Sequence, residues 1–285
     1  MIFKKKQVTI LIAILFILLN ISSIKAETFL PLSYKNESAL NFGKETDGNQ
    51  KILDSTKSCN NDFSTLSEDN TALILNPSEY IYGNQYCLKI INKLHQRGYY
   101  TEYLSNEAVD LYYIKTNLTA DIVYINTHAG YFDLDGDNKS DTVVISTGEH
   151  WTNETPLKYK FEYENQMIVE GRVGDKRFVA FTPALINYYY NPGDLPNSLI
   201  YMAACYAAYD NSMAQVFLNK GASAYIGWNK NTAFWTNSIT SVLAFRFFIN
   251  GFNVKQVCNL IRSGGFVNFF LQSKLTFYGD GNYRI

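Results

Sequence analysis

The stretch that decides the fold reads ADIVYINT, from Ala120 to Thr127. Successive side chains of a strand point to opposite faces, so the apolar residues of this stretch fall on both faces. A strand that is hydrophobic on both faces is typical of the middle of a parallel sheet that helices cover on both sides. We therefore expect a buried parallel strand here, with helices packed above and below it.

Strands and helices alternate on both sides of this stretch. The predicted elements before it are strand 72–77, helix 85–97, strand 99–104 and helix 106–118. Those after residue 181 are helix 183–190, strand 198–203, helix 211–220, strand 222–228, helices 238–250 and 254–262, and strand 275–278. Short strand–helix–strand connections are typical of right-handed parallel crossovers. The fold class is therefore α/β, a three-layer sandwich with a mostly parallel central sheet and helices on both faces.

Residues 131–181 interrupt this alternation. Three segments within them, 158–163, 167–173 and 178–181, alternate polar and apolar residues or are rich in residues that favour strands. Turn residues separate the three segments, a pattern that favours antiparallel strands. We expect an inserted β-meander within a single α/β domain that covers residues 71–285.

The first 26 residues have the composition of a secretory signal peptide. Lysines at 4–6 precede a 12-residue apolar stretch, 8–19, and Ala26 ends a candidate cleavage site. This stretch is too short for a transmembrane helix, which needs roughly 20 residues. We expect a secreted or cell-surface protein without stable membrane insertion after cleavage. The alternative is an uncleaved N-terminal anchor, because residues 24–26 match a cleavage site imperfectly.

The chain that remains after this segment is mildly acidic. It has 21 basic and 26 acidic residues, a net charge of −5, so no basic field indicates nucleic-acid binding. Residues 27–70 are rich in Asn, Ser, Asp, Lys and Glu and show no clear hydrophobic period. Such a composition is typical of a polar linker or a pro-segment rather than of a folded core.

Two reactive side chains stand directly after predicted core strands. His128 follows the strand 120–127, and Cys205 follows the strand 198–203. In open α/β sheets, reactive groups collect at the carboxyl ends of the strands, so parallel neighbours would bring the imidazole and the thiol to one edge. A neighbouring histidine is the usual base that turns a thiol into a nucleophile. The alternative is a buried cysteine with no catalytic role.

The surroundings of these two residues resemble the caspase-like cysteine peptidases of clan CD, nearest to the gingipain and clostripain types. In that family one apolar strand ends in His-Gly and a second ends in Ala-Cys or Asp-Cys. This chain has His128-Ala129-Gly130 and Ala204-Cys205. Residues 214–228 look like the helix, Gly-Ala turn and strand that follow in the family, and 277–280 look like the closing Gly-Asp. The resemblance covers about residues 71–285.

The resemblance implies a caspase-like fold and a cysteine endopeptidase that acts on a protein or peptide substrate. Cys205 would attack the scissile carbonyl, His128 would protonate the departing amine, and water would hydrolyse the acyl-enzyme. The resemblance also implies an oxyanion hole, formed by the backbone N–H of Ala129 or Gly130 together with the backbone N–H of Cys205. The alternative is a catalytically inert caspase-like surface module that binds protein or glycan. A lowered pKa of the Cys205 thiol is expected of the active dyad only.

Two further residues are candidates for the substrate pocket. In relatives that cleave after Arg or Lys an acidic residue lines this pocket, and Asp210 is the candidate counterpart. The alternative is that Asp210 caps the helix predicted from Asn211. Trp228 ends the strand beside that of Cys205 and is either a pocket wall or part of the core.

An acidic loop follows His128 along the chain. Its alternate residues are Asp133, Asp135, Asp137, Lys139 and Asp141. Carboxylates at the first, third, fifth and ninth positions of a tight loop are how proteins surround Ca²⁺ with oxygen ligands. The loop departs from the helix–loop–helix calcium motif at its sixth and twelfth positions and lies between predicted strands. We expect a structural Ca²⁺ site here, and the alternative is a solvated acidic turn.

Overall fold

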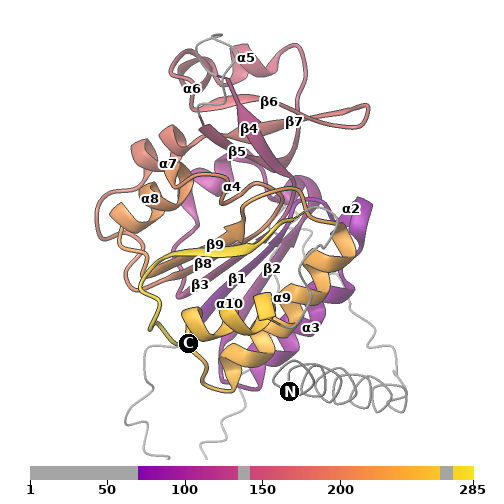
Figure 1. Cartoon of the computed structure of the whole chain (residues 1–285). Helices are drawn as coiled ribbons and strands as arrows, with labels where there is room; N and C mark the ends of the chain where they lie inside the picture. The colour runs from indigo at the N-terminus through magenta and orange to yellow at the C-terminus, as the bar shows by residue number, and fades with distance from the viewer. Residues whose placement is uncertain (1–69, 134–141, 264–271) are drawn as a thin grey trace, which may run out of the picture. The chain divides into compact units, whose positions relative to one another are not determined.

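A six-stranded sheet, sheet A, forms the centre of the computed structural model, which describes residues 70–133, 142–263 and 272–285 (Figure 1). Its strands, in spatial order, are β10 (Leu275–Gly279), β9 (Ala224–Trp228), β8 (Leu199–Ala203), β3 (Ile122–Asn126), β1 (Thr71–Asn76) and β2 (Tyr100–Ser105). The first of these runs antiparallel to β9, and the other pairs of neighbours are parallel. The predicted mostly parallel α/β sheet is confirmed.

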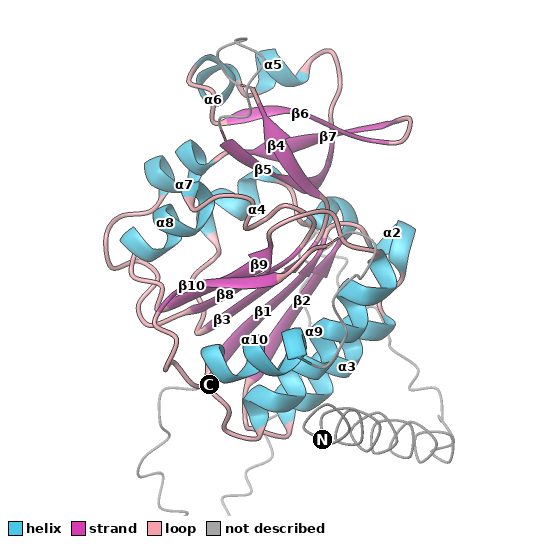
Figure 2. Ribbon diagram, in the orientation of Figure 1, coloured by secondary structure: helices cyan, strands magenta, loops and turns pink. Residues whose placement is uncertain are grey.

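Helices cover both faces of sheet A (Figure 2). One face carries α3 (Gln85–His95), α9 (Phe234–Ile249) and α10 (Val254–Ser263), and the other carries α4 (Leu111–Thr116), α7 (Pro183–Tyr189) and α8 (Ser212–Asn219). Alternate residues of each strand supply the two cores. In β1, for example, Ile74 packs into the core with α3, and Leu75 into the core with α4. A strand with apolar residues on both faces therefore lies between two helix layers, as the sequence predicted.

The segment predicted as one helix from 106 to 118 is broken in two. A 3-10 turn, η2 (Asn106–Ala108), precedes α4 and does not continue into it. The break occurs because Asp110 has extended backbone and caps α4, its carboxylate accepting a hydrogen bond from the Tyr113 N–H at 2.7 Å. Aspartate competes for backbone donors in this way and so favours helix starts over helix interiors.

The inserted residues form a second, antiparallel sheet, sheet B. Its strands, in spatial order, are β4 (Ala129–Phe132), β5 (Thr142–His150), β7 (Lys176–Phe181) and β6 (Ile168–Val173). The β-rich insert is confirmed, but the predicted meander is wrong, because β7 lies between β5 and β6. The predicted strand 158–163 is also wrong: the chain there forms the short helices α5 (Thr155–Lys158) and α6 (Lys160–Glu164). Pro156 in the first turn of α5 favours this helix start.

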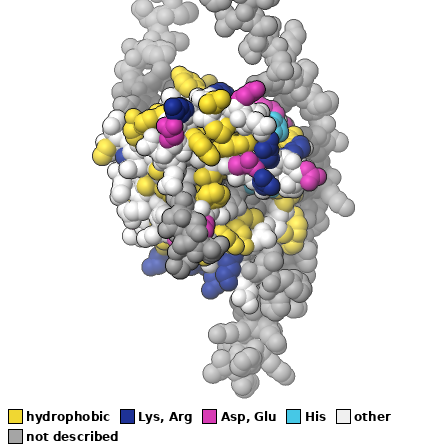
Figure 3. Space-filling view, turned by 90° about the horizontal axis from the view of Figure 1, so that it is seen from above, with side chains coloured by type: hydrophobic (Ala, Val, Ile, Leu, Met, Phe, Trp, Pro, Cys, Tyr) yellow, Lys and Arg dark blue, Asp and Glu magenta, His cyan; other side chains and the backbone are white. Residues whose placement is uncertain are grey.

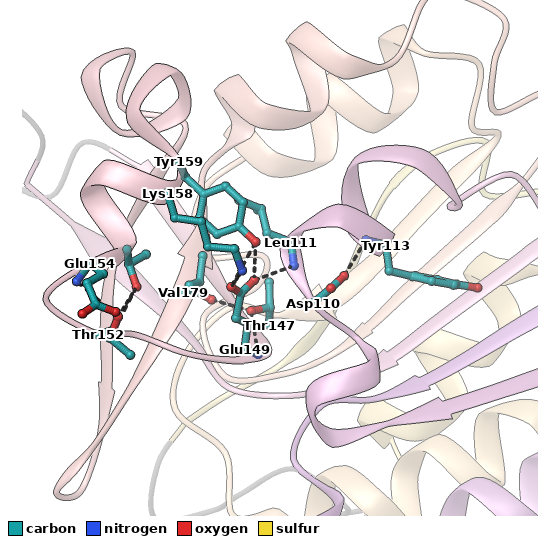
Figure 4. A network of polar contacts seen from close by, with 11 residues as sticks. Asp110, Leu111, Tyr113, Thr147, Glu149, Thr152, Glu154, Lys158, Tyr159 and Val179 are labelled. Atoms are coloured by element: carbon teal, nitrogen blue, oxygen red, sulfur yellow. Dashed lines mark hydrogen bonds and ion pairs between the residues drawn. The ribbon is translucent and has the colours of Figure 1, made fainter. Parts of the chain in front are cut away.

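Glu149, near the end of β5, joins sheet B to α4 (Figure 4). Its carboxylate accepts hydrogen bonds from Lys158 Nζ at 2.6 Å, from the Tyr159 hydroxyl at 2.9 Å and from the Leu111 N–H at 3.2 Å. Leu111 begins α4, and the first N–H groups of a helix have no partner within the helix. The carboxylate of the insert therefore completes a helix start in the main domain.

A buried ion pair makes a second connection between the insert and the helices. Lys115 Nζ of α4 lies 2.7 Å from Glu162 Oε1 of α6, and these side chains are only 13% and 8% exposed. The Tyr189 hydroxyl of α7 donates to the same oxygen at 2.6 Å. Burial alone would raise the pKa of Glu162, but the hydrogen bonds from Lys115 and Tyr189 outweigh it and the pKa is lowered. The carboxylate is thus held in its charged form.

The predictions for the N-terminal part of the chain are not tested by the fold. The signal peptide, 1–26, and the linker or pro-segment, 27–70, lie outside the described residues except for Asn70. Among the helices of the described segments, none combines the length and the apolar character that crossing a bilayer requires.

We predict that Glu162→Gln destabilises the protein at pH 7 by about 3 kcal/mol, because it leaves the buried Lys115 ammonium without a charged partner. The pKa of Glu162 is lowered in the folded protein. Its carboxylate therefore contributes stability that is fully present above the unfolded pKa of about 4.3. This contribution is lost as the pH falls through the lower folded pKa. Urea unfolding of both proteins at neutral and acid pH should show the difference between them shrinking in acid.

The matched control for this variant is Glu164→Gln. Lys160 and Glu164 also form an ion pair, at 3.7 Å, but their side chains are 69% and 61% exposed. Exposed pairs at this helical spacing contribute only about 0.3–0.5 kcal/mol, so the control should unfold close to wild type. If Glu162→Gln loses no more stability than Glu164→Gln, the buried pair does not anchor the insert.

Candidate functional site

The structure places His128 and Cys205 at the same edge of sheet A, as the sequence predicted. β3 and β8 are parallel neighbours, and their register pairs Asn126 with Ala203. The Thr127 N–H continues this ladder to the Ala203 carbonyl at 3.4 Å. His128 and Cys205 stand at equivalent positions just beyond the paired residues. The imidazole and the thiol therefore emerge from adjacent strand ends.

The Cys205 thiol faces the loop that follows β9. Its sulfur lies 3.1 Å from Asn231 Oδ1 and 3.4 Å from the Thr232 carbonyl, and the Thr232 N–H approaches it at 3.3 Å. Burial raises the pKa of Cys205, and the nearby N–H groups of Thr232 and of Cys205 itself offset this only in part. The thiol is therefore protonated at neutral pH.

His128 contacts Tyr82 rather than Cys205. Tyr82 ends the short helix α2 (Glu79–Tyr82), and its hydroxyl lies 2.9 Å from His128 Nε2. The Tyr82 ring stacks on Phe234, with ring centroids 3.9 Å apart and planes tilted by 11°. Within the described residues no hydrogen bond joins His128 to Cys205. Burial lowers the pKa of His128, so the imidazole is neutral at pH 7.

The two reactive groups thus form a neutral pair. A lowered pKa of the Cys205 thiol is expected of an active dyad, whereas burial raises the pKa of this thiol. The physical cause is burial, which disfavours the charged form of a thiol and of an imidazole alike. Any nucleophilic chemistry at this site must move the thiol proton during the reaction.

A network of buried asparagines holds the strand ends beneath the two side chains. Asn126 donates to Asn76 Oδ1 at 2.9 Å, and Asn237 of α9 donates to the Ala203 carbonyl at 2.8 Å. The Trp228 indole N–H donates to Asn237 Oδ1 at 2.8 Å. Trp228 is itself buried, so it belongs to the core and not to a pocket wall. Fully paired polar groups in a core fix one arrangement of the elements they join.

The register of β4 distinguishes the two candidate oxyanion-hole donors. β4 pairs antiparallel with β5, with Ala129 opposite Ile145, and the Ser146 N–H donates to the His128 carbonyl at 2.9 Å. In an antiparallel ladder, alternate residues direct their N–H and C=O groups toward and away from the partner strand. Gly130 therefore uses its N–H within sheet B, whereas that of Ala129 points away from β5. Of the two candidate donors, Ala129 is therefore the one whose N–H is directed away from the ladder with β5.

The local contacts of Asp210 favour the capping interpretation. Its carboxylate accepts hydrogen bonds from the Ser212 N–H at 2.8 Å and from the Ser212 hydroxyl at 2.6 Å. Ser212 is the first residue of α8, so Asp210 satisfies a free donor at this helix start. The structure thus gives Asp210 a structural role.

The acidic loop falls mostly outside the described residues. Asp133 is described, but Asp135, Asp137, Lys139 and Asp141 are not. Elsewhere, the described segments contain no cluster of three or more His, Cys, Asp or Glu side chains that could hold a metal ion. Calcium binding by this loop stays a prediction from the sequence.

Sequence reasoning missed Tyr82 and a group of three further tyrosines beside the site. Tyr82 comes from a four-residue helix that carries no hydrophobic period. Tyr131, Tyr206 and Tyr209 pack against one another at the exit from the two strands. These three tyrosines could have been predicted as neighbours of the site, because they lie within four residues of His128 or Cys205 in the sequence.

Comparison of the chain with models of known protein families gives no match, and neither does comparison with curated protein sequences.

Proposed function

We propose that this protein is a secreted cysteine endopeptidase of caspase-like fold that hydrolyses peptide bonds through Cys205 and His128. The observation that carries the proposal is the register of sheet A, which pairs Asn126 with Ala203 and so brings the two reactive side chains to one edge. The resemblance of the His-Ala-Gly and Ala-Cys segments to clan CD peptidases supports the same roles. The composition of residues 1–26 supports secretion.

The neutral thiol and imidazole determine how the proton moves during acylation. As the sulfur of Cys205 bonds to the scissile carbonyl carbon, the thiol proton passes to His128 and the carbonyl oxygen becomes an oxyanion. The backbone N–H groups of Ala129 and Cys205 would hold this oxyanion. The imidazolium then gives its proton to the amide nitrogen as the C–N bond breaks. A thioester remains on Cys205.

Water completes the cycle at the same two residues. His128, again neutral, takes a proton from water as the water oxygen attacks the thioester carbon. The proton passes to the sulfur of Cys205 as the C–S bond breaks. Because burial lowers the pKa of His128, its protonated form gives up the proton readily in both half-reactions. Before acylation, His128 exchanges its hydrogen bond with Tyr82 for one with the thiol.

The second candidate function is a catalytically inert module that binds a protein or a glycan. The observation that favours it is the resting state of the site, in which burial raises the pKa of Cys205 while His128 is bonded to Tyr82. An inert cysteine would keep this arrangement permanently. The two candidates differ in whether substrate can displace Tyr82 from the imidazole.

We predict that the purified protein cleaves members of a mixed peptide library under reducing conditions. Cys205→Ala and His128→Ala should each lower the rate by about a thousandfold or more, because each removes a group that acts on the reacting atoms. His95→Ala is the matched control, since His95 lies on the surface with Thr101 as its partner. Mass spectrometry of the library identifies the cleaved bonds. A folded wild-type protein that cleaves nothing, with Cys205 slow toward iodoacetamide, would favour the inert module.

We also predict an unusual pH dependence for the two groups. Because burial raises the pKa of Cys205, alkylation of the folded protein by iodoacetamide should be slow at pH 7 and reach half its maximal rate above pH 9.0, the ordinary thiol value. Because burial lowers the pKa of His128, the acid limb of kcat/KM should fall below pH 6.5. Peptide-level mass spectrometry gives the rate at each cysteine.

The buried cysteines Cys87 and Cys258 are internal controls for this titration. Burial raises the pKa of each to about 12. Both should stay unmodified over the pH range in which Cys205 begins to react. Rapid alkylation of Cys205 at neutral pH in the free protein would show that the site holds a thiolate, contrary to the neutral pair.

A further inference from the structure

Three tyrosines form a cluster beside the dyad, which we call the tyrosine platform. The Tyr131 ring lies 5.2 Å from that of Tyr206 in an edge-on contact and 5.1 Å from that of Tyr209 in a stacked one. Tyr131 and Tyr209 are 48% and 46% exposed, so the platform presents aromatic surface to solvent. Exposed hydrophobic side chains are visible between charged ones in the view of the molecule from above (Figure 3).

The backbone of Tyr206 is held in an unfavourable conformation. Tyr206 directly follows Cys205 and has φ of +57°, in the left-handed region that favours glycine. Its N–H donates to the Lys230 carbonyl at 3.3 Å, and its carbonyl accepts from the Tyr209 N–H at 2.9 Å. A large aromatic residue at such a position is explained when its ring is needed there, because glycine would avoid the strain.

The open edge of sheet B lies next to this platform. β4 is the edge strand of sheet B and begins directly after His128. By the alternation of the ladder, the N–H and C=O groups of Ala129 and Tyr131 point away from β5, and no strand of the described chain pairs with them. An exposed strand edge is a ready partner for an extended peptide.

We propose that the substrate binds as an added strand on the open edge of β4 and places a large apolar or aromatic side chain on the tyrosine platform. This inference deepens the proposed peptidase function and rests on it. The Ala129 N–H, which would hold the oxyanion, belongs to the same edge. The scissile residue is therefore the one opposite Ala129, beside Cys205 and His128.

The geometry of a strand pair then determines which substrate position is selected. Residues two apart in a strand lie on the same face. The substrate residue opposite Tyr131 is thus two positions away from the scissile residue, with its side chain on the face of Tyr131. Tyr206 and Tyr209 pack against that same ring. Aromatic rings favour apolar and aromatic partners, so this position of the substrate is selected for such side chains.

The experiment compares Tyr131→Ala, Tyr206→Gly and Tyr209→Ala with wild type. The probes are acetylated alanine-based octapeptides that carry Phe, Leu, Lys or Asp at one position in turn. Glycine suits the backbone of Tyr206, so the second variant should fold at least as well as wild type. Tyr112→Ala is the matched control, because Tyr112 is 65% exposed on α4 and takes no part in the ring contacts of the platform.

We expect wild type to favour Phe or Leu two residues from the scissile residue by about tenfold in kcat/KM over Asp or Lys. Each platform variant should lose this preference, its kcat/KM on the Phe and Leu peptides falling toward its own value on the Asp and Lys peptides. The control should keep the preference. Unchanged selectivity in all three variants, or selection at the scissile residue alone, would overturn the proposal and leave the peptidase function standing.

A second measurement applies if no peptide is cleaved. Calorimetric titration of the Cys205→Ala protein with the same octapeptides tests binding without chemistry. Binding of the Phe peptide that weakens about tenfold in the platform variants would support the added-strand site while the peptidase function fails. Binding of maltohexaose and of no peptide would overturn the proposal in favour of a glycan platform. Binding of neither would overturn it outright.

Discussion

The pairing of Asn126 with Ala203 fixes where the two reactive side chains emerge, and the rest of the candidate site depends on it. A slip of one residue between β3 and β8 would send every side chain of one strand to the opposite helix layer, so two hydrophobic cores oppose it. Asn237 adds a polar constraint, because its amide donates to the Ala203 carbonyl at 2.8 Å. Breaking that bond would leave buried polar groups without partners, which costs about 1–3 kcal/mol for each group.

Burial acts on both members of the pair in the same direction. It raises the pKa of Cys205 and lowers the pKa of His128, so the resting site contains no net charge on either group. Tyr82 reinforces this state, because its hydroxyl occupies the hydrogen-bonding position at His128 Nε2. A protonated thiol is a weak nucleophile, so a site of this kind would react slowly with solutes in its resting state. In the proposed peptidase, such restraint would protect the thiol from reactions without substrate.

The parts of the structure that the sequence predicted are those with a strong local signal. The strand ADIVYINT and its neighbours carry continuous apolar runs, and the capped start Thr182-Pro183 identifies α7, where the Ala184 N–H donates to the Thr182 hydroxyl at 3.2 Å. The edge shared by His128 and Cys205 followed from strand order alone. The failures arise where tertiary contacts outweigh local pattern. Residues 158–163 alternate like a strand, but they fold as helix while Glu162 reaches the buried Lys115.

Contacts between distant segments were beyond prediction for the same reason. Tyr82 meets His128 across 46 positions of the chain, and Asn237 meets Asn126 across 111. Neither pair has a period or a motif in the sequence. The spatial order of sheet B could not be predicted either. Turn residues indicate that β6 and β7 form a hairpin, but they do not specify that β7, and not β6, pairs with β5.

The insert is therefore part of the candidate site and not an appendage to it. Ser146 of β5 donates its N–H to the His128 carbonyl at 2.9 Å, and its own carbonyl accepts from the Thr127 hydroxyl at 2.8 Å. The backbone that carries the imidazole is thus held by sheet B on one side and by β8 on the other. Glu149 and the Lys115–Glu162 pair in turn fix the insert to α4. Loosening of the insert would remove the contacts from Ser146 that hold the backbone of His128, so the stability of sheet B contributes to the placement of the imidazole beside Cys205.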